Sequence, residues 1–297
     1  MRCISHLRPT NWTTGSGAES EELMMNACLA RPLRTLTFLA VLIFCSALSA
    51  SADPIPVRHV EGTLHGFLAL RTQDGKLVAV GDLTQTVRGD QVTSRLVFRF
   101  KDGSVDDETT VFSQHGTFRL ITNHRIQKGP SFPQPLDLSI DARSGRVTVR
   151  SIGNDGKEEV RVEHLDLPPD LANGLVLSIA KNLPPETPET KLSILIATPK
   201  PRIVKLAILP RGEESFSVAG SARKAMRYDL KLELGAITGL VAPLIGKQPP
   251  DFHIWILGGK APAFVKEEGV LYEGGPILTI ELTSPVWPQG SNSRSSK

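Results

Sequence analysis

Apolar and polar side chains alternate along most of this chain, and this pattern constrains the fold more than any other feature. Between 226 and 234, Met226 and Tyr228 begin a row of apolar residues at every second position, and Arg227 and Asp229 begin a row of charged residues between them. A repeat of two places successive side chains on opposite faces of a β-strand. The segment is therefore predicted to be a strand with one face on a core and the other in water.

Short strands joined by tight turns are predicted for much of the remaining chain. Asp74-Gly75 and Asp102-Gly103 supply the positive-φ positions that hairpin turns require. Strands that follow one another at a spacing of roughly 8–12 residues indicate an antiparallel meander and not βαβ units. The other predicted strands are 62–72, 76–87, 95–101, 109–114, 117–127, 136–141, 146–152, 158–165, 190–198, 202–209, 252–257 and 277–284.

One segment departs from this pattern and is predicted to be a helix over 169–183. Leu171, Leu175 and Ile179 recur every four residues, and prolines stand at both ends of the range. Proline at the first turn and just after the last one fits helix start and stop signals. Gly174 inside the helix costs about 1 kcal/mol relative to Ala, so this helix needs to pack against the sheet.

These elements predict a mainly β fold. We expect a strongly curved antiparallel meander sheet that forms a half or full barrel, with one packing helix near 169–183. The strands are expected to form a single β domain over 53–287, and the proline-rich stretch 184–188 is the boundary if they form two. The polar, Ser-rich end, 288–297, is predicted to be a disordered tail.

The first 52 residues are predicted to be an upstream extension followed by a signal peptide. Basic residues precede the apolar run 36–48, and Ala50-Ser51-Ala52 has the small residues of a cleavage site. The run is shorter than the roughly 20 residues that a membrane-spanning helix needs. We therefore expect a periplasmic or secreted protein after cleavage near Ala52, with an uncleaved membrane anchor as the alternative.

All three cysteines, Cys3, Cys28 and Cys45, lie in this leader. A mature chain without cysteine cannot use thiol catalysis, thiolate zinc sites or iron–sulfur clusters. The formal net charge of +3 is small, and binding to phosphate groups needs a strong basic excess. Nucleic acid is therefore excluded as the main partner, and the expected partners are an apolar small molecule or lipid, or a protein of the cell envelope.

Sequence signatures of catalysis are absent. The chain contains no G-x-S-x-G, H-E-x-x-H, P-loop or G-x-G-x-x-G motif, so we expect no enzyme, no metal and no cofactor. His115 and His124 could meet across a hairpin, but single histidines in strands are more often structural or solvated. Asp106-Asp107-Glu108 lacks the spacing of a calcium loop and is predicted to be a solvated turn.

The segment that most suggests a function is the apolar stretch 234–246, which has no clean period of two. Loops normally run over the surface, so an apolar loop must be buried, bind a ligand or contact a membrane. Burial as a plug at the end of the sheet is the simplest interpretation, and a ligand site is the alternative. The residues that would line such a site are Leu171, Leu175, Ile179, Ile237, Leu240, Val241, Leu244 and Trp255.

Five segments stand out in the C-terminal third: 242–250 (APLIGKQPP), 253–256 (HIWI), 262–265 (PAFV), 271–277 (LYEGGPI) and 284–288 (SPVWP). In these segments the chain resembles a group of uncharacterised exported bacterial proteins. The match extends from about Gly62 to Pro288. This group is in turn similar to half-barrel periplasmic proteins of the lipoprotein-carrier type, in which a curved antiparallel sheet wraps an apolar concave face. The resemblance implies a fold and a location but no activity, because the group has no assigned catalytic residues.

Three classes of function follow from these observations. The first is a non-enzymatic binding or carrier module for an apolar or lipid-like ligand, held by the helix and the 234–246 loop. The alternative is a structural or interaction protein of the cell envelope with a filled core. The third is a hydrolase whose catalytic groups are scattered along the chain.

Overall fold

The computed structural model describes most of the chain after the leader, namely residues 55–152, 156–197, 200–218, 221–233 and 251–283. They belong to the compact unit Ala52–Lys297. The predicted signal peptide, the apolar stretch 234–246 and the tail 288–297 lie outside the described residues. The statements about them remain predictions.

The described residues form one 14-stranded antiparallel sheet. Its strands are β1 (Leu64–Thr72), β2 (Leu77–Arg88), β3 (Gln91–Phe100), β4 (Val105–Ser113), β5 (Arg119–Lys128), β6 (Leu136–Asp141), β7 (Arg146–Ile152), β8 (Glu158–His164), β9 (Thr190–Ile196), β10 (Arg202–Val218), β11 (Ser221–Glu233), β12 (Phe252–Leu257), β13 (Ala263–Gly269) and β14 (Leu278–Thr283). A short helix, α2 (Val176–Ala180), lies between β8 and β9 in the sequence.

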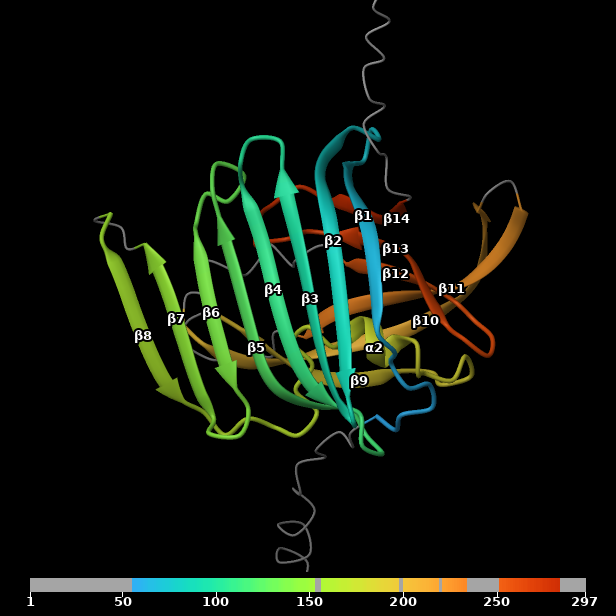
Figure 1. Ribbon diagram of the computed structural model, residues 1–297, viewed down its shortest axis with the longest axis horizontal. Helices are drawn as coiled ribbons and strands as arrows, with labels where there is room; N and C mark the ends of the chain where they lie inside the picture. The colour runs from blue at the N-terminus through green and yellow to red at the C-terminus, as the bar shows by residue number, and fades with distance from the viewer. Residues whose placement is uncertain (1–54, 153–155, 198–199, 219–220, 234–250, 284–297) are drawn as a thin grey trace, which may run out of the picture. The chain divides into compact units, whose positions relative to one another are not determined.

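The sheet consists of two meanders that meet where the first strand pairs with the last. The strand order is β8-β7-β6-β5-β4-β3-β2-β1-β14-β13-β12-β11-β10-β9, so β8 and β9 are the edges. Figure 1 shows β1–β8 as one curved array, with β9–β14 lying across it. No described residue pairs β8 with β9, and the sheet stays open as a half barrel. The prediction of a curved antiparallel meander is confirmed.

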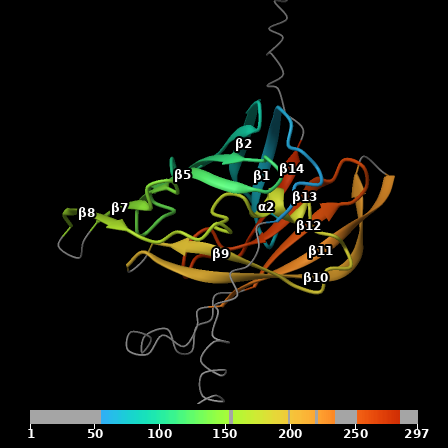
Figure 2. The ribbon, with the colours of Figure 1, turned by 90° about the horizontal axis from the view of Figure 1, so that it is seen from below.

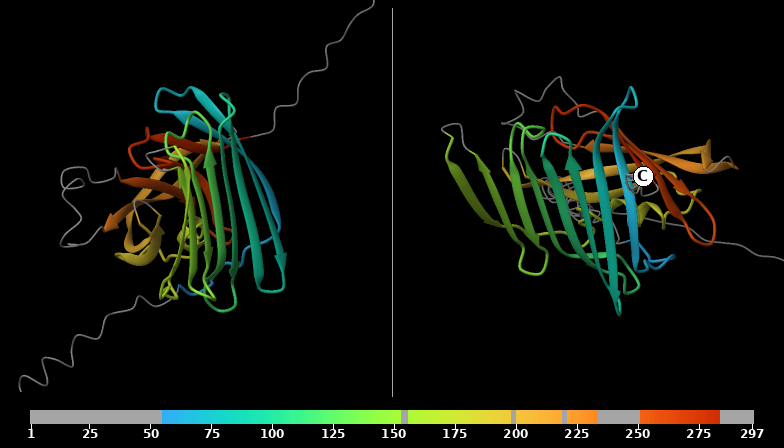
Figure 3. Two further views of the ribbon diagram at one scale, coloured as in Figure 1. Left: turned by 90° about the vertical axis from the view of Figure 1, so that its left-hand side faces the viewer. Right: turned by 45° about the horizontal axis from the view of Figure 1, so that its top comes forward.

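The sheet curves around the segment 165–189, which we call the crossing segment because it leads from edge strand β8 to edge strand β9. Leu175 and Ile179 of this segment belong to one buried cluster with Val147 of β7, Ile208 of β10 and Ile254 of β12. Figures 2 and 3 show α2 between the two meanders. The crossing segment therefore fills the space that the curved sheet encloses, because burying apolar surface from both meanders is the main stabilising effect.

The predicted helix 169–183 is much shorter in the structure, which has α-helix only at Val176–Ala180. Gly174 has a φ of 70°, a left-handed conformation that an α-helix does not contain. Leu171, further upstream, forms a β-bridge with Ser193. The four-residue apolar spacing reflects burial of the crossing segment, and only Val176–Ala180 is helical.

The sequence pattern missed β13 and placed the start of β4 too late. Over Ala263–Gly269, three apolar residues precede three charged ones, so the strand shows no alternation of apolar and polar residues. β4 begins at Val105 and contains Asp106-Asp107-Glu108, which had been predicted to be a solvated turn. That prediction is wrong: Asp106 is only 4% exposed. The three acids are strand residues because arginine and amide side chains on the neighbouring strands bind their carboxylates.

Candidate functional site

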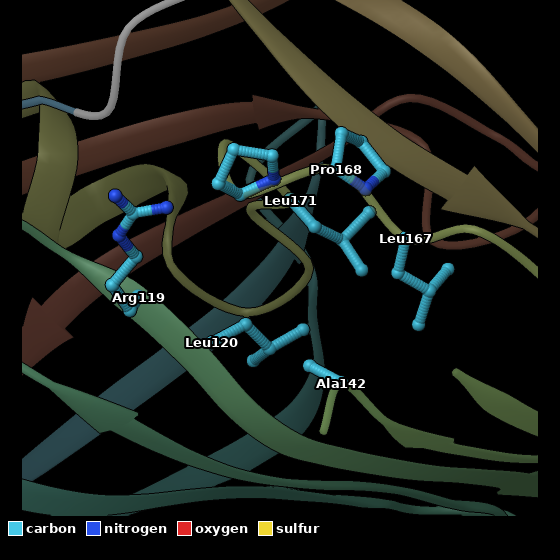
Figure 4. A pocket seen from close by; sticks show the side chains of 7 residues that line it. Arg119, Leu120, Ala142, Leu167, Pro168 and Leu171 are labelled. Atoms are coloured by element: carbon cyan, nitrogen blue, oxygen red, sulfur yellow. The ribbon is translucent and has the colours of Figure 1, made fainter. Parts of the chain in front are cut away.

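A cavity of about 190 Å³ lies between the start of β5 and the crossing segment (Figure 4). Its wall is formed by the start of β5, the residue that follows β6 and the first residues of the crossing segment. Its lining residues are Arg119, Leu120, Ala142, Leu167, Pro168, Pro169 and Leu171. Six of these seven residues have apolar side chains, and polar atoms of Arg119 and of the backbone contribute much of the surface that the cavity exposes.

Local backbone contacts hold this wall in place. The Ala142 N–H donates to the carbonyl of Ile121 at 3.0 Å, and the Leu171 N–H donates to the carbonyl of Pro168 at 3.1 Å. The prolines at 168 and 169 fix φ near −65° and supply no N–H donor. They therefore restrict the backbone conformation at the start of the crossing segment. The methyl side chain of Ala142 leaves space that a larger residue would fill.

Arg119 is the only charged residue among those that line the cavity. Its side chain is exposed, and within the described part of the chain it makes no ion pair or side-chain hydrogen bond. Figure 4 shows the side chain rising from β5 beside the crossing segment. A guanidinium has five N–H donors arranged to bind a carboxylate or phosphate. The cavity thus combines several apolar side chains with a group that attracts anions.

The structure brings together three of the eight predicted site residues. Leu171, Leu175 and Ile179 are 3%, 1% and 3% exposed and lie in the same buried cluster. Of these, only Leu171 lines the cavity. The four predicted residues of the apolar stretch, Ile237, Leu240, Val241 and Leu244, lie outside the described residues.

The eighth residue, Trp255, lies elsewhere, on the outer face of the sheet. Its neighbour Ile254 points into the buried cluster, so the side chain of Trp255 projects to the opposite face. Lys266 Nζ lies 3.9 Å from the centre of the indole ring, and the Arg227 guanidinium carbon lies 5.6 Å from it. The indole N–H donates to Glu214 Oε2 at 2.8 Å. These charged side chains cover Trp255, which is not one of the residues that line the cavity.

A second group of polar side chains lies on the inner face of the sheet. We call it the inner polar cluster and define it as Asp106, Glu108, Asn123, Arg125 and Glu267. Arg125 donates two hydrogen bonds to Asp106, from Nε to Oδ1 at 3.0 Å and from Nη2 to Oδ2 at 2.7 Å. Asn123 donates to Glu108 Oε1 at 2.8 Å. The sequence offered one signal for this cluster, the acidic triplet at 106–108, but not its arginine partner.

Burial and neighbouring charges shift the pKa values of Glu267 and Arg125 in the inner polar cluster. Burial raises the pKa of Glu267 to about 7; Arg125 acts in the opposite direction, and Glu108 adds to the increase. Burial lowers the pKa of Arg125, but the charge and hydrogen bonds of Asp106 outweigh this effect and raise it above its usual value. Glu267 can therefore gain or lose a proton near neutral pH.

The histidines do not form a site within the described residues. His115 Nδ1 lies 2.8 Å from Asp90 Oδ2, and His124 Nε2 lies 2.9 Å from Asp137 Oδ1. His124 is opposite Thr109 in the sheet, so the two histidines do not meet across the hairpin. In the part of the chain that the structure describes, no three His, Cys, Asp or Glu side chains are grouped to hold a metal ion. The same part contains no helix long and apolar enough to cross a membrane.

Comparisons with known proteins add one structural likeness. No family model matches the chain, and no curated protein matches it. Among solved structures, the chain is similar to the crystal structure of a β-barrel-like protein of the domain of unknown function DUF1849 from Brucella abortus. The two chains are 7% identical, the TM-score is 0.45, and the match covers 77% of this chain and 99% of that one.

Proposed function

We propose that this protein is a non-enzymatic binding module for a small apolar molecule that carries an anionic group. The single observation that supports this is the cavity with six apolar side chains in its wall beside Arg119, which has no ion-pair partner among the described residues. Burial of a hydrocarbon chain against Leu120 and Leu171 would remove apolar surface from water. A carboxylate or phosphate at the head of the same ligand would accept hydrogen bonds from the guanidinium.

The size of the cavity limits the ligand. Pockets that enclose a drug-sized molecule measure about 300–1,000 Å³, whereas this one measures about 190 Å³. The ligand class we propose is therefore a short-chain amphiphile, or the end of one chain of a larger lipid. A periplasmic or secreted location remains part of the proposal, and it is supported by the signal-peptide pattern of the first 52 residues.

The test is a titration of the purified protein with octanoate by isothermal calorimetry, beside octanol as the uncharged analogue. We expect octanoate to bind more tightly than octanol. Arg119→Gln should abolish this preference, and Ala142→Phe should reduce binding of both ligands by filling the space. Arg143→Gln is the matched control, because Arg143 is exposed and does not line the cavity. Binding that Arg119→Gln and Ala142→Phe leave unchanged, or no binding at all, would refute the proposal.

The second candidate is a structural or interaction protein of the cell envelope with a filled core. It is favoured by the packing of the crossing segment, in which Ala172, Leu175 and Ala180 are 0%, 1% and 1% exposed. Native mass spectrometry distinguishes the two functions. A bare polypeptide mass, together with no octanoate binding, supports the filled-core protein, and a bound amphiphile supports the binding module.

A further inference from the structure

The inner polar cluster contains two carboxylates that have no cation bound to them. Arg125 is the one cation of the cluster, and both of its hydrogen bonds within the cluster go to Asp106. The side chain of Glu267 forms no hydrogen bond or ion pair with a described residue, and Glu108 forms no ion pair with one. Three carboxylates against one guanidinium leave the ionised cluster with an excess of negative charge.

A buried acceptor in the same cluster also lacks a partner. Asn123 is only 1% exposed, and its Nδ2 donates to Glu108 Oε1 at 2.8 Å and to Thr110 Oγ1 at 3.0 Å. Its Oδ1 is buried and has no hydrogen-bond partner among the described residues. A buried acceptor without a donor is destabilising, and in native structures such atoms usually bond to a water, an ion or a ligand. The cluster therefore has more acceptors than the chain supplies donors.

The cluster lies between the two meanders, where solvent still reaches it. Glu267 is on β13, whereas Glu108 and Arg125 are on β4 and β5. The loop after β13 contacts β5 directly, because the carbonyl of Leu271 accepts hydrogen bonds from Gln127 Nε2 at 2.9 Å and from Arg125 Nη2 at 3.4 Å. The side chain of Arg125 is 28% exposed, and Glu108 and Glu267 are only partly buried. A small molecule can therefore reach the two carboxylates.

Apolar side chains border both carboxylates on the same face of the sheet. Leu96 of β3 lies opposite Glu108 and is partly buried. Ile280 of β14 lies opposite Glu267. Leu282, two residues further along the same face of β14, is 52% exposed. Exposed apolar surface beside a few polar groups is typical of ligand-binding grooves. A ligand that reaches the carboxylates can therefore place a hydrocarbon group against these leucines.

We propose that the inner polar cluster is a second binding site, which takes a small aliphatic amine in its ammonium form. An ammonium group carries a positive charge and three N–H donors, and it supplies the charge and the donors that the cluster lacks. A metal ion fits less well, because no three His, Cys, Asp or Glu side chains in the described ranges are grouped to hold one. No member of the cluster lines the Arg119 cavity. The two sites would therefore select ligands of opposite charge.

The test is a titration of the purified protein with n-butylammonium chloride by isothermal calorimetry, at about pH 8 so that Glu267 is ionised. The ionic strength is held constant, and n-butanol is the uncharged analogue. We expect butylammonium to bind at least about tenfold more tightly than butanol. Glu267→Gln and Glu108→Gln should each weaken the binding of butylammonium by at least about tenfold, because each removes one negative charge and keeps the shape of the side chain.

Each variant has a matched control, which is the adjacent residue on the opposite face of the same strand. Glu268→Gln and Asp107→Asn should leave binding unchanged, since both carboxylates form ion pairs on the outer face. Urea unfolding checks that each variant is folded, and Glu267→Gln should be at least as stable as the wild type at this pH. No heat of binding at millimolar butylammonium overturns the proposal. So does binding that butanol matches, that Glu267→Gln and Glu108→Gln leave intact, or that the controls weaken equally.

Discussion

Replacing Glu267 by glutamine should make the protein more stable at neutral and alkaline pH. Burial raises the pKa of this carboxyl from 4.5 to about 7 in the folded protein. An acid whose folded pKa is raised binds its proton more tightly in the folded state. Its contribution to stability is therefore complete below about pH 4.5 and is lost as the pH rises to about 7.

The magnitude follows from the size of that shift. At 1.36 kcal/mol per pKa unit, the difference between 4.5 and about 7 corresponds to about 3 kcal/mol. Because the side chain keeps partial contact with water, we expect between about 1 and 3 kcal/mol. Glu267→Gln removes the charge and keeps the shape. The variant should match the wild type near pH 4.5 and exceed its stability by this amount above pH 7.

The assay is urea unfolding at a series of pH values from about 4 to about 8. The quantity compared is the difference in free energy of unfolding between variant and wild type at each pH, in which the titration of other groups cancels. Glu268→Gln is the matched control, because Glu268 is the next residue along β13 and projects to the opposite face, towards Lys266. A difference that stays constant with pH, or that falls as the pH rises, would refute this reasoning.

Two further predictions concern single contacts on the inner face. Asp106→Ala removes the carboxylate that accepts two hydrogen bonds from the partly buried guanidinium of Arg125 and should cost about 3 kcal/mol. Asp107→Ala on the exposed face should cost about 1 kcal/mol or less. Comparable losses of the two variants in urea unfolding would contradict this difference. Gly174→Ala should destabilise the protein by more than about 1 kcal/mol, because φ is positive and a Cβ atom would collide with neighbouring side chains. Gly75→Ala has the same backbone penalty with nothing nearby, so an equal fall in melting temperature for the two variants would disprove the steric part.

The alternation of apolar and polar residues was sufficient to predict the fold class and most strands. β11 is the clearest case, because Tyr228 and Leu230 lie in the buried cluster and Arg227 and Asp229 lie on the outer face, as predicted. β13 was missed for a physical reason. It carries Glu267 on the inner face, where a core strand ordinarily has an apolar residue.

The candidate site was less predictable than the fold. The recurrence of apolar residues at every fourth position correctly indicated that Leu171, Leu175 and Ile179 are buried together. It did not require a continuous helix, because a segment buried against two meanders can show the same spacing. Arg119 carried no signal in the sequence, since a single arginine at the start of a strand is common. Its role depends on the crossing segment, whose position is fixed by contacts between residues far apart in the chain.

The pairing of β1 with β14 has a consequence for how the protein folds during synthesis. Leu70 lies opposite Ile280, so the seam between the two meanders joins the first and the last of the described strands. Each meander can form from contacts between neighbours in sequence, but the seam must wait until the ribosome has released the C-terminal strand. Until then β1 has an unprotected edge, and a delay at this stage exposes the nascent chain to misassembly.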